Sequence, residues 1–166
     1  MKNLVTMLML TAAAPAAADI SVRFQESAPK DSFVITNAGT CPLGNVILTL
    51  DLGASAAGLI FDVTGAGAGV SVFQPLEIIA GQEYLASVPE VKDGDSEISL
   101  PLQGLDAGAT VAFTIDVDDT KGTTATMISG SEITGAQVVL ESRAVTVEAE
   151  FGADATAFAP FSACSV

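Results

Sequence analysis

The chain has 166 residues, of which 20 are acidic and 6 are basic, so its formal net charge is −14. It contains no histidine, which excludes Ser-His-Asp and Cys-His nucleophiles, His-ligated metal centres and a near-neutral imidazole base. The excess of acidic residues argues against binding to nucleic acid or to anionic membrane surfaces, because both need a cationic footprint.

The first segment, residues 1–18, has the three parts of a secretory signal peptide. A basic start with Lys2 is followed by an apolar run over residues 4–10 and by small residues that end in Ala16-Ala17-Ala18. This apolar run is too short to cross a bilayer, which needs about 20 residues. We therefore expect cleavage after Ala18 and no membrane insertion. The mature part, residues 19–166, is expected to be one domain in the periplasm or the external medium.

Alternation of apolar and polar residues predicts strands along most of the mature chain and almost no helix. The clearest alternating runs cover residues 20–24, 46–52, 98–103, 113–118 and 145–151. Shorter candidates cover residues 32–36, 59–63, 70–73, 77–79, 124–128 and 137–141. Turns rich in Gly, Asp and Asn separate these runs. The pattern predicts an all-β fold, an antiparallel two-sheet sandwich of the Ig-like or jelly-roll-like kind, with a closed barrel as the alternative.

The mature part contains two cysteines, Cys41 and Cys164. An even number of cysteines in an oxidising compartment favours a disulfide. This bond would join an early loop to the C-terminal segment and close nearly the whole domain. Two buried free thiols are the alternative.

An acidic run, Asp116-Val117-Asp118-Asp119, ends one of the predicted strands. On a strand, Asp116 and Asp118 would project from the same solvent face, with Asp119 at the end of that strand. Two interpretations stay open: a solvated polar face, or a site for Ca²⁺, which takes six to eight oxygen ligands and relieves repulsion between carboxylates. Further ligands for such a site could come from Glu132, Asp62 or Asp51.

Catalysis by carboxylates alone has little support in the sequence. Twenty acidic residues offer many pairs, so the presence of a pair carries no information about glycoside hydrolysis. Sugar clefts are usually lined with aromatic platforms, and this chain has one tyrosine, Tyr84, and no tryptophan. We therefore expect a protein that is not an enzyme.

Several segments together resemble a known family. They are residues 28–41, 58–63, 65–75, 113–120 and 130–136. Their succession is similar to small secreted bacterial proteins described as "aggregation factor core". The resemblance covers most of the mature chain and rests on strand and turn segments. It implies an extracellular adhesion role by analogy with calcium-dependent aggregation factors, and it brings no active-site residues.

The sequence thus predicts a secreted, non-catalytic binding or adhesion protein that acts with the assistance of Ca²⁺ if the acidic run is a metal site. Its partner would be a protein or a surface glycan, and the chain itself could form oligomers. The alternative is a structural or accessory subunit of a periplasmic or cell-surface assembly, which would associate through an edge strand.

Overall fold

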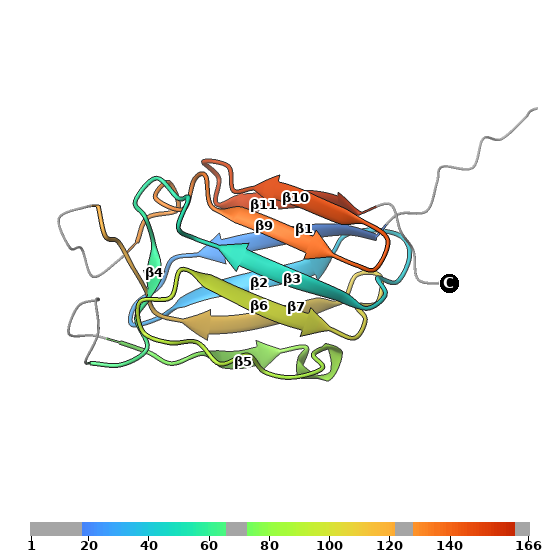
Figure 1. Cartoon of the computed structure of the whole chain (residues 1–166), viewed down its shortest axis with the longest axis horizontal. Coiled ribbons are helices and arrows are strands. Elements are labelled where there is room, and N and C mark those ends of the chain that lie inside the picture. Colours follow the sequence, from blue (N-terminus) through green and yellow to red (C-terminus); the bar gives the residue numbers. More distant parts are fainter. Residues whose placement is uncertain (1–17, 66–72, 122–127, 162–166) are drawn as a thin grey trace, which may run out of the picture.

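The protein is a β-sandwich of two antiparallel sheets that pack face to face (Figure 1). The computed structural model describes residues 18–65, 73–121 and 128–161. The five-stranded sheet has the order β11 (Thr156–Phe161), β1 (Ala18–Gln25), β2 (Asp31–Asn37), β7 (Thr110–Ile115) and β5 (Glu77–Ala80). The four-stranded sheet has the order β10 (Thr146–Glu150), β9 (Gln137–Glu141), β3 (Val46–Asp51) and β6 (Glu97–Leu102).

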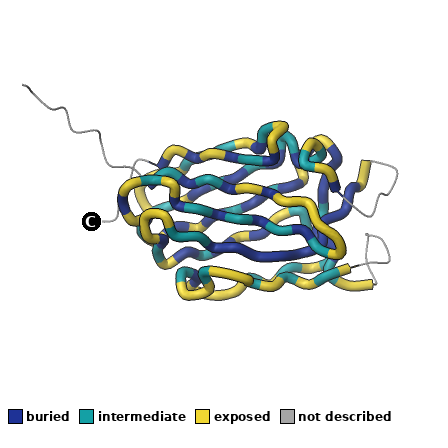
Figure 2. Tube along the Cα trace, turned by 180° about the vertical axis from the view of Figure 1, so that it is seen from behind, coloured by how far each residue is buried: buried dark blue, intermediate teal, exposed yellow. Residues whose placement is uncertain are grey.

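The core lies between the two sheets and follows the alternation of the sequence. In β1, β2 and β3 every second residue is buried, so each strand turns one face to the core. Three rings pack in sequence across the five-stranded sheet: the ring centroids of Phe24 and Phe33 are 5.2 Å apart, and those of Phe33 and Phe113 are 5.1 Å apart. Figure 2 shows the buried positions along the central strands and the exposed positions on β5 and in the loops.

A third, two-stranded sheet lies at one end of the sandwich. It pairs β4 (Ile60–Phe61) with β8 (Val117–Asp118) in antiparallel register. A short 3₁₀ helix, η1 (Gln82–Tyr84), follows β5. The small sheet belongs neither to the five-stranded nor to the four-stranded sheet.

The predicted sandwich is confirmed, and the exceptions have physical causes. Residues 137–141 form β9 as predicted. Strand β11 was not predicted, because its inward residues include the small Ala157 and Ala159 and its outward residues include Pro160, which weakens the alternation of apolar and polar positions. The predicted strand over residues 113–118 divides at Asp116 into β7 and β8. The predicted strand positions 70–72 and 124–127 lie outside the described residues.

The predicted cleavage site lies at the start of the described chain, and one of the two predicted disulfide cysteines lies beyond its end. Ala18 is the first residue of β1, is fully buried and pairs with Phe161 of β11. Residues 1–17 and Cys164 lie outside the described residues, so cleavage after Ala18 and the disulfide stay predictions; Cys41 itself is buried. In the part of the chain that the structure describes, no helix is long and apolar enough to cross a membrane.

Candidate metal site

Three buried aspartates converge at the small sheet. Asp62 follows β4, Asp116 lies between β7 and β8, and Asp118 is the second residue of β8. One carboxylate oxygen from each of the three lies within 4.8 Å of the others. This spacing suits three ligands of one ion, because Ca²⁺ binds oxygen at about 2.3–2.6 Å.

The backbone of the small sheet fixes this arrangement. Ile60 lies opposite Asp118, and Phe61 lies opposite Val117. One step further along, the N–H of Asp62 donates a 3.1 Å hydrogen bond to the carbonyl of Asp116. The ladder therefore places Asp62 and Asp116 opposite each other. The hydrogen bond between Asp62 and Asp116 thus continues the antiparallel pairing one residue beyond β4.

The strand breaks at Asp116 because the chain changes its partner there. Up to Ile115 it pairs with β2 and β5 as strand β7. The N–H of Asp116 instead donates to the carbonyl of Gln74, and the next two residues pair with β4. The neighbouring turn also covers this end, since Gly94 donates to the carbonyl of Phe61.

The acidic run is therefore buried, and the expectation that it lies on a solvent face is wrong. Asp62 is 1% exposed, Asp116 is 7% exposed and Asp118 is 4% exposed. The sequence showed an alternating strand with polar residues on its outer side. It could not show that β4 and the turn around Gly94 cover that side.

Asp62 is the most unusual member of the group. Among the residues that the structure describes, neither of its carboxylate oxygens has a hydrogen-bond partner, and one oxygen of Asp116, Oδ2, has none either. The groups beside Asp62 are the carboxyls of Asp93 and Asp118, and two carboxyls can form a hydrogen bond only when one is protonated. Burial, and then contact with these two acids, raises the pKa of Asp62 from its ordinary value of 3.8 to about 7.

Asp93 is a fourth carboxylate beside the group. From the sequence, Asp93-Gly94-Asp95 leaves a metal site and a tight turn open and favours the turn. Its Oδ1 accepts hydrogen bonds of 2.9 Å from the N–H groups of Val63 and Thr64. These bonds hold the turn at Asp93 against the segment that follows β4. The sequence Asp93-Gly94-Asp95 indicates a tight turn, which accounts for its position in a loop, but it does not say which segment the turn will contact.

Asp31 adds a further buried carboxyl beside the group. It is the first residue of β2, lies opposite Ile115 and accepts a 3.0 Å hydrogen bond from the N–H of Ser27. Burial raises the pKa of Asp31 to about 7, and the charge of Asp116 adds to this increase. Burial, followed by the charge of Asp118, raises the pKa of Asp116 to about 6.

The residues suggested from sequence are only partly brought together. Asp116 and Asp118 belong to the group, and of the further ligands suggested from sequence Asp62 joins them. Asp119 is also buried but is not one of the three that converge. Asp51 instead accepts a hydrogen bond from the N–H of Gly53, and Glu132 accepts one from the N–H of Ser129, so both have local roles.

The arrangement suits a hard cation. Ionised carboxylates at this spacing in a buried site repel one another strongly. Ca²⁺ takes oxygen atoms as its ligands, and both carboxylate oxygens of Asp62 lack a hydrogen-bond donor among the described residues. Comparison with family models, with curated proteins and with solved structures found no match to the chain. Support for metal binding therefore comes from the residues of the site and from no related protein.

Proposed function

We propose that the protein is a secreted, non-catalytic binding protein of the adhesion type, and that its β-sandwich binds Ca²⁺ through Asp62, Asp116 and Asp118. The observation that carries the metal site is the pair of unpartnered carboxylate oxygens on Asp62, a side chain that is 1% exposed. A buried carboxylate without a donor is costly, and a bound cation removes that cost.

The other parts of the proposal rest on the sequence. The signal-peptide pattern in residues 1–18 supports export. The resemblance to proteins described as "aggregation factor core" supports an adhesion role. The absence of histidine supports a non-catalytic protein, because the common nucleophile and base arrangements need one.

The position of the ion within the fold suggests how it would act. The three aspartates come from two segments that are distant in the chain, and Asp93 comes from a third. An ion held by Asp62, Asp116 and Asp118 would cross-link the segment after β4 to β8. Asp93 also holds the neighbouring turn against that segment. All three convergent aspartates are buried. The ion would therefore stabilise this end of the sandwich rather than contact a partner directly.

Association through an edge strand, the alternative function, has less support. Strand β10 carries the exposed charges of Glu148 and Glu150, and β11 and β6 contain Pro160 and Pro101. Strand β5 has four residues and an irregular register with β7. Charges, prolines, irregular register and short length all protect edge strands from pairing with another chain.

Thermal unfolding with and without calcium tests the proposal. A ligand present at 100 times its Kd stabilises the folded state by about 2.7 kcal/mol. For a domain of about 150 residues this corresponds to an increase in Tm of about 5–10 °C. Magnesium at the same concentration is the control, because its stricter octahedral geometry suits a cluster of protein carboxylates less well. If millimolar calcium leaves the Tm of the chelator-treated protein unchanged, the metal site is wrong.

A further inference from the structure

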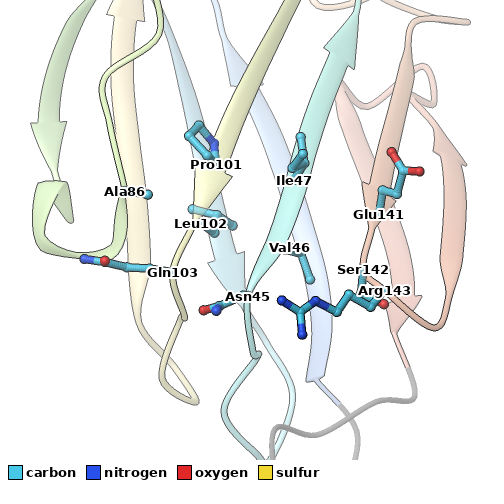
Figure 3. Close-up of a pocket in the computed structure, with 10 residues that line it drawn as sticks. All are labelled: Asn45, Val46, Ile47, Ala86, Pro101, Leu102, Gln103, Glu141, Ser142 and Arg143. Carbon is cyan, nitrogen blue, oxygen red and sulfur yellow. The ribbon is translucent and has the colours of Figure 1, made fainter.

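A groove lies on the outer face of the four-stranded sheet. The strand ends that line it lie at the end of the sandwich opposite β4 and the candidate metal site (Figure 1). The volume of the groove is about 510 Å³, and it lies where β3 begins and where β6 and β9 end. Figure 3 shows Ile47, Pro101 and Leu102 in its centre, with Ala86 on one side and with Glu141 and Arg143 on the other.

Six large apolar residues are exposed in the described part of the chain, and Ile47 is the one that lines this groove; the others are Phe73, Ile79, Val88, Val145 and Phe158. The outward positions of β3 are Ile47, Thr49 and Asp51, so an isoleucine stands where the alternation calls for a polar residue. Its side chain is 46% exposed, and its register partners on the two neighbouring strands are Pro101 and Glu141. Apolar side chains in a hollow with polar residues at its rim are typical of a binding surface.

A second hollow lies beside the first. It has a volume of about 600 Å³ and shares the lining residues Asn45 and Gln103 with the groove, so the two are adjacent, and we call them together the trough. The N–H of Gln103 donates to the carbonyl of Tyr84, and its Nε2 donates to the carbonyl of Glu83, both at 2.9 Å. These bonds hold the wall of the second hollow against the end of β6. Gln103, which lines both hollows, is therefore held in place by the segment of η1.

The charges around the trough favour a basic partner. Glu83 and Asp106 line the second hollow, and Glu141 lines the first, against a single cation, Arg143. Over the ranges that the structure describes, the one ion pair joins Lys30 to Glu77, so none of the three carboxylates is neutralised by a salt bridge. The net charge of −14 adds a long-range attraction for cations.

We propose that the trough docks a basic, extended segment of a partner protein. An apolar side chain of that segment would lie on Ile47 and Pro101. A lysine or arginine would lie beside Glu83 and Asp106, because Arg143 repels a cation on the other side. This site goes beyond the proposed calcium-binding function and shares no residue with it.

Two other occupants fit the trough less well. A second copy of the chain would bring together two molecules that each carry a net charge of −14. A glycan usually stacks on aromatic side chains, and the lining of the trough offers only Tyr84, which donates a 3.2 Å hydrogen bond to Asp106. Both become outcomes of the experiment.

The experiment measures binding of a fluorescent peptide, acetyl-Lys-Lys-Leu-Lys-Lys-amide, to the mature protein by anisotropy, in calcium and again in chelator. A peptide with serine in place of leucine tests the apolar contact. The paired substitution Glu83→Gln and Asp106→Asn removes two charges from the trough. The paired substitution Glu148→Gln and Glu150→Gln removes two charges from the outer face of β10 and serves as the matched control.

We expect the trough pair to weaken binding about tenfold and the control pair less than about twofold, since each exposed charge pair contributes modestly. Ile47→Thr should lower the affinity for the leucine peptide to that for the serine peptide.

Equal losses for both pairs would overturn the proposal, because binding would then follow the overall charge. Displacement of the peptide by maltohexaose would overturn it in favour of a glycan. Dimerisation that Ile47→Thr abolishes, without peptide binding, would overturn it in favour of a second copy. Peptide affinity should be the same in calcium and in chelator. Binding to the trough would then not depend on the metal site, and the two proposals can fail independently.

Discussion

The backbone N–H of Asp62 donates a 3.1 Å hydrogen bond to the carbonyl of Asp116, and this bond places two buried carboxyl side chains opposite each other. The pairing is the continuation of the β4–β8 ladder, so the sheet itself determines it. Secondary structure thus holds two like charges together at a cost in stability. A bound cation would convert that cost into a stabilising interaction.

The first prediction concerns Asp62→Asn, which keeps the size of the side chain and removes its charge. In chelator at neutral pH we expect the substitution to raise the Tm by about 2–4 °C, or ~1 kcal/mol in a domain of this size, because carboxylate repulsion is relieved. The increase in Tm on adding calcium should disappear, because one ligand has lost its charge. Differential scanning calorimetry of the variant, with and without calcium, measures both effects.

Glu148→Gln is the control for this substitution, since Glu148 is exposed on β10. It should leave both the Tm and the calcium response close to those of the wild type. A lower Tm for Asp62→Asn in chelator would contradict the prediction, because Asp62 would then be stabilising the fold without an ion.

The second prediction concerns pH. The pKa values of Asp31 and Asp62 are raised from 3.8 to about 7, and that of Asp116 to about 6, with burial as the largest cause. Between these values and 3.8 the folded state holds protons that the unfolded chain has released, so the free energy of unfolding falls as the pH rises. In chelator, these three groups should therefore lower the Tm as the pH rises from about 4 to about 7.

Calcium should reduce this decrease, because the ion replaces the protons as the partner of the carboxylates. Melting curves recorded across the pH range, with and without calcium, test the two effects together. A Tm that rises with pH in chelator would show that these carboxyls are ionised and stabilising in the folded state.

The sandwich could be predicted from the sequence, because a core between two sheets requires alternation and β1 and β3 alternate clearly. The carboxylate cluster of the candidate metal site could be predicted only in part. Asp116 and Asp118 stand out as neighbours in the chain, whereas Asp62 and Asp93 join them through the β4–β8 ladder and a turn. A two-residue strand such as β4 has no period to recognise. Contacts of this kind depend on the tertiary fold.

The third prediction concerns the two cysteines, Cys41 and Cys164. Mass analysis without reductant should find both thiols oxidised to one disulfide. Loss of this bond should lower stability by about 2–4 kcal/mol, since it closes a long loop of the unfolded chain. Cys164→Ala is the informative substitution, because it removes the bond and leaves the buried Cys41 in place. The reduced wild-type protein is its control, and two free thiols in the oxidised protein would contradict the prediction.

The last prediction separates a ligand from a neighbour of the site. Asp31 is buried beside Asp116 but is not one of the three convergent carboxylates. Asp31→Asn keeps an oxygen that can accept the hydrogen bond from the N–H of Ser27 and removes a charge that repels Asp116. We expect a higher Tm in chelator, as for Asp62→Asn, but an increase in Tm with calcium that is retained. Calorimetric titration should give a calcium Kd within about threefold of the wild-type value, since no ligand is lost. If calcium binding disappears in Asp31→Asn and persists in Asp62→Asn, the ion is bound on the Asp31 side of Asp116, and the assignment of Asp62 as a ligand is wrong.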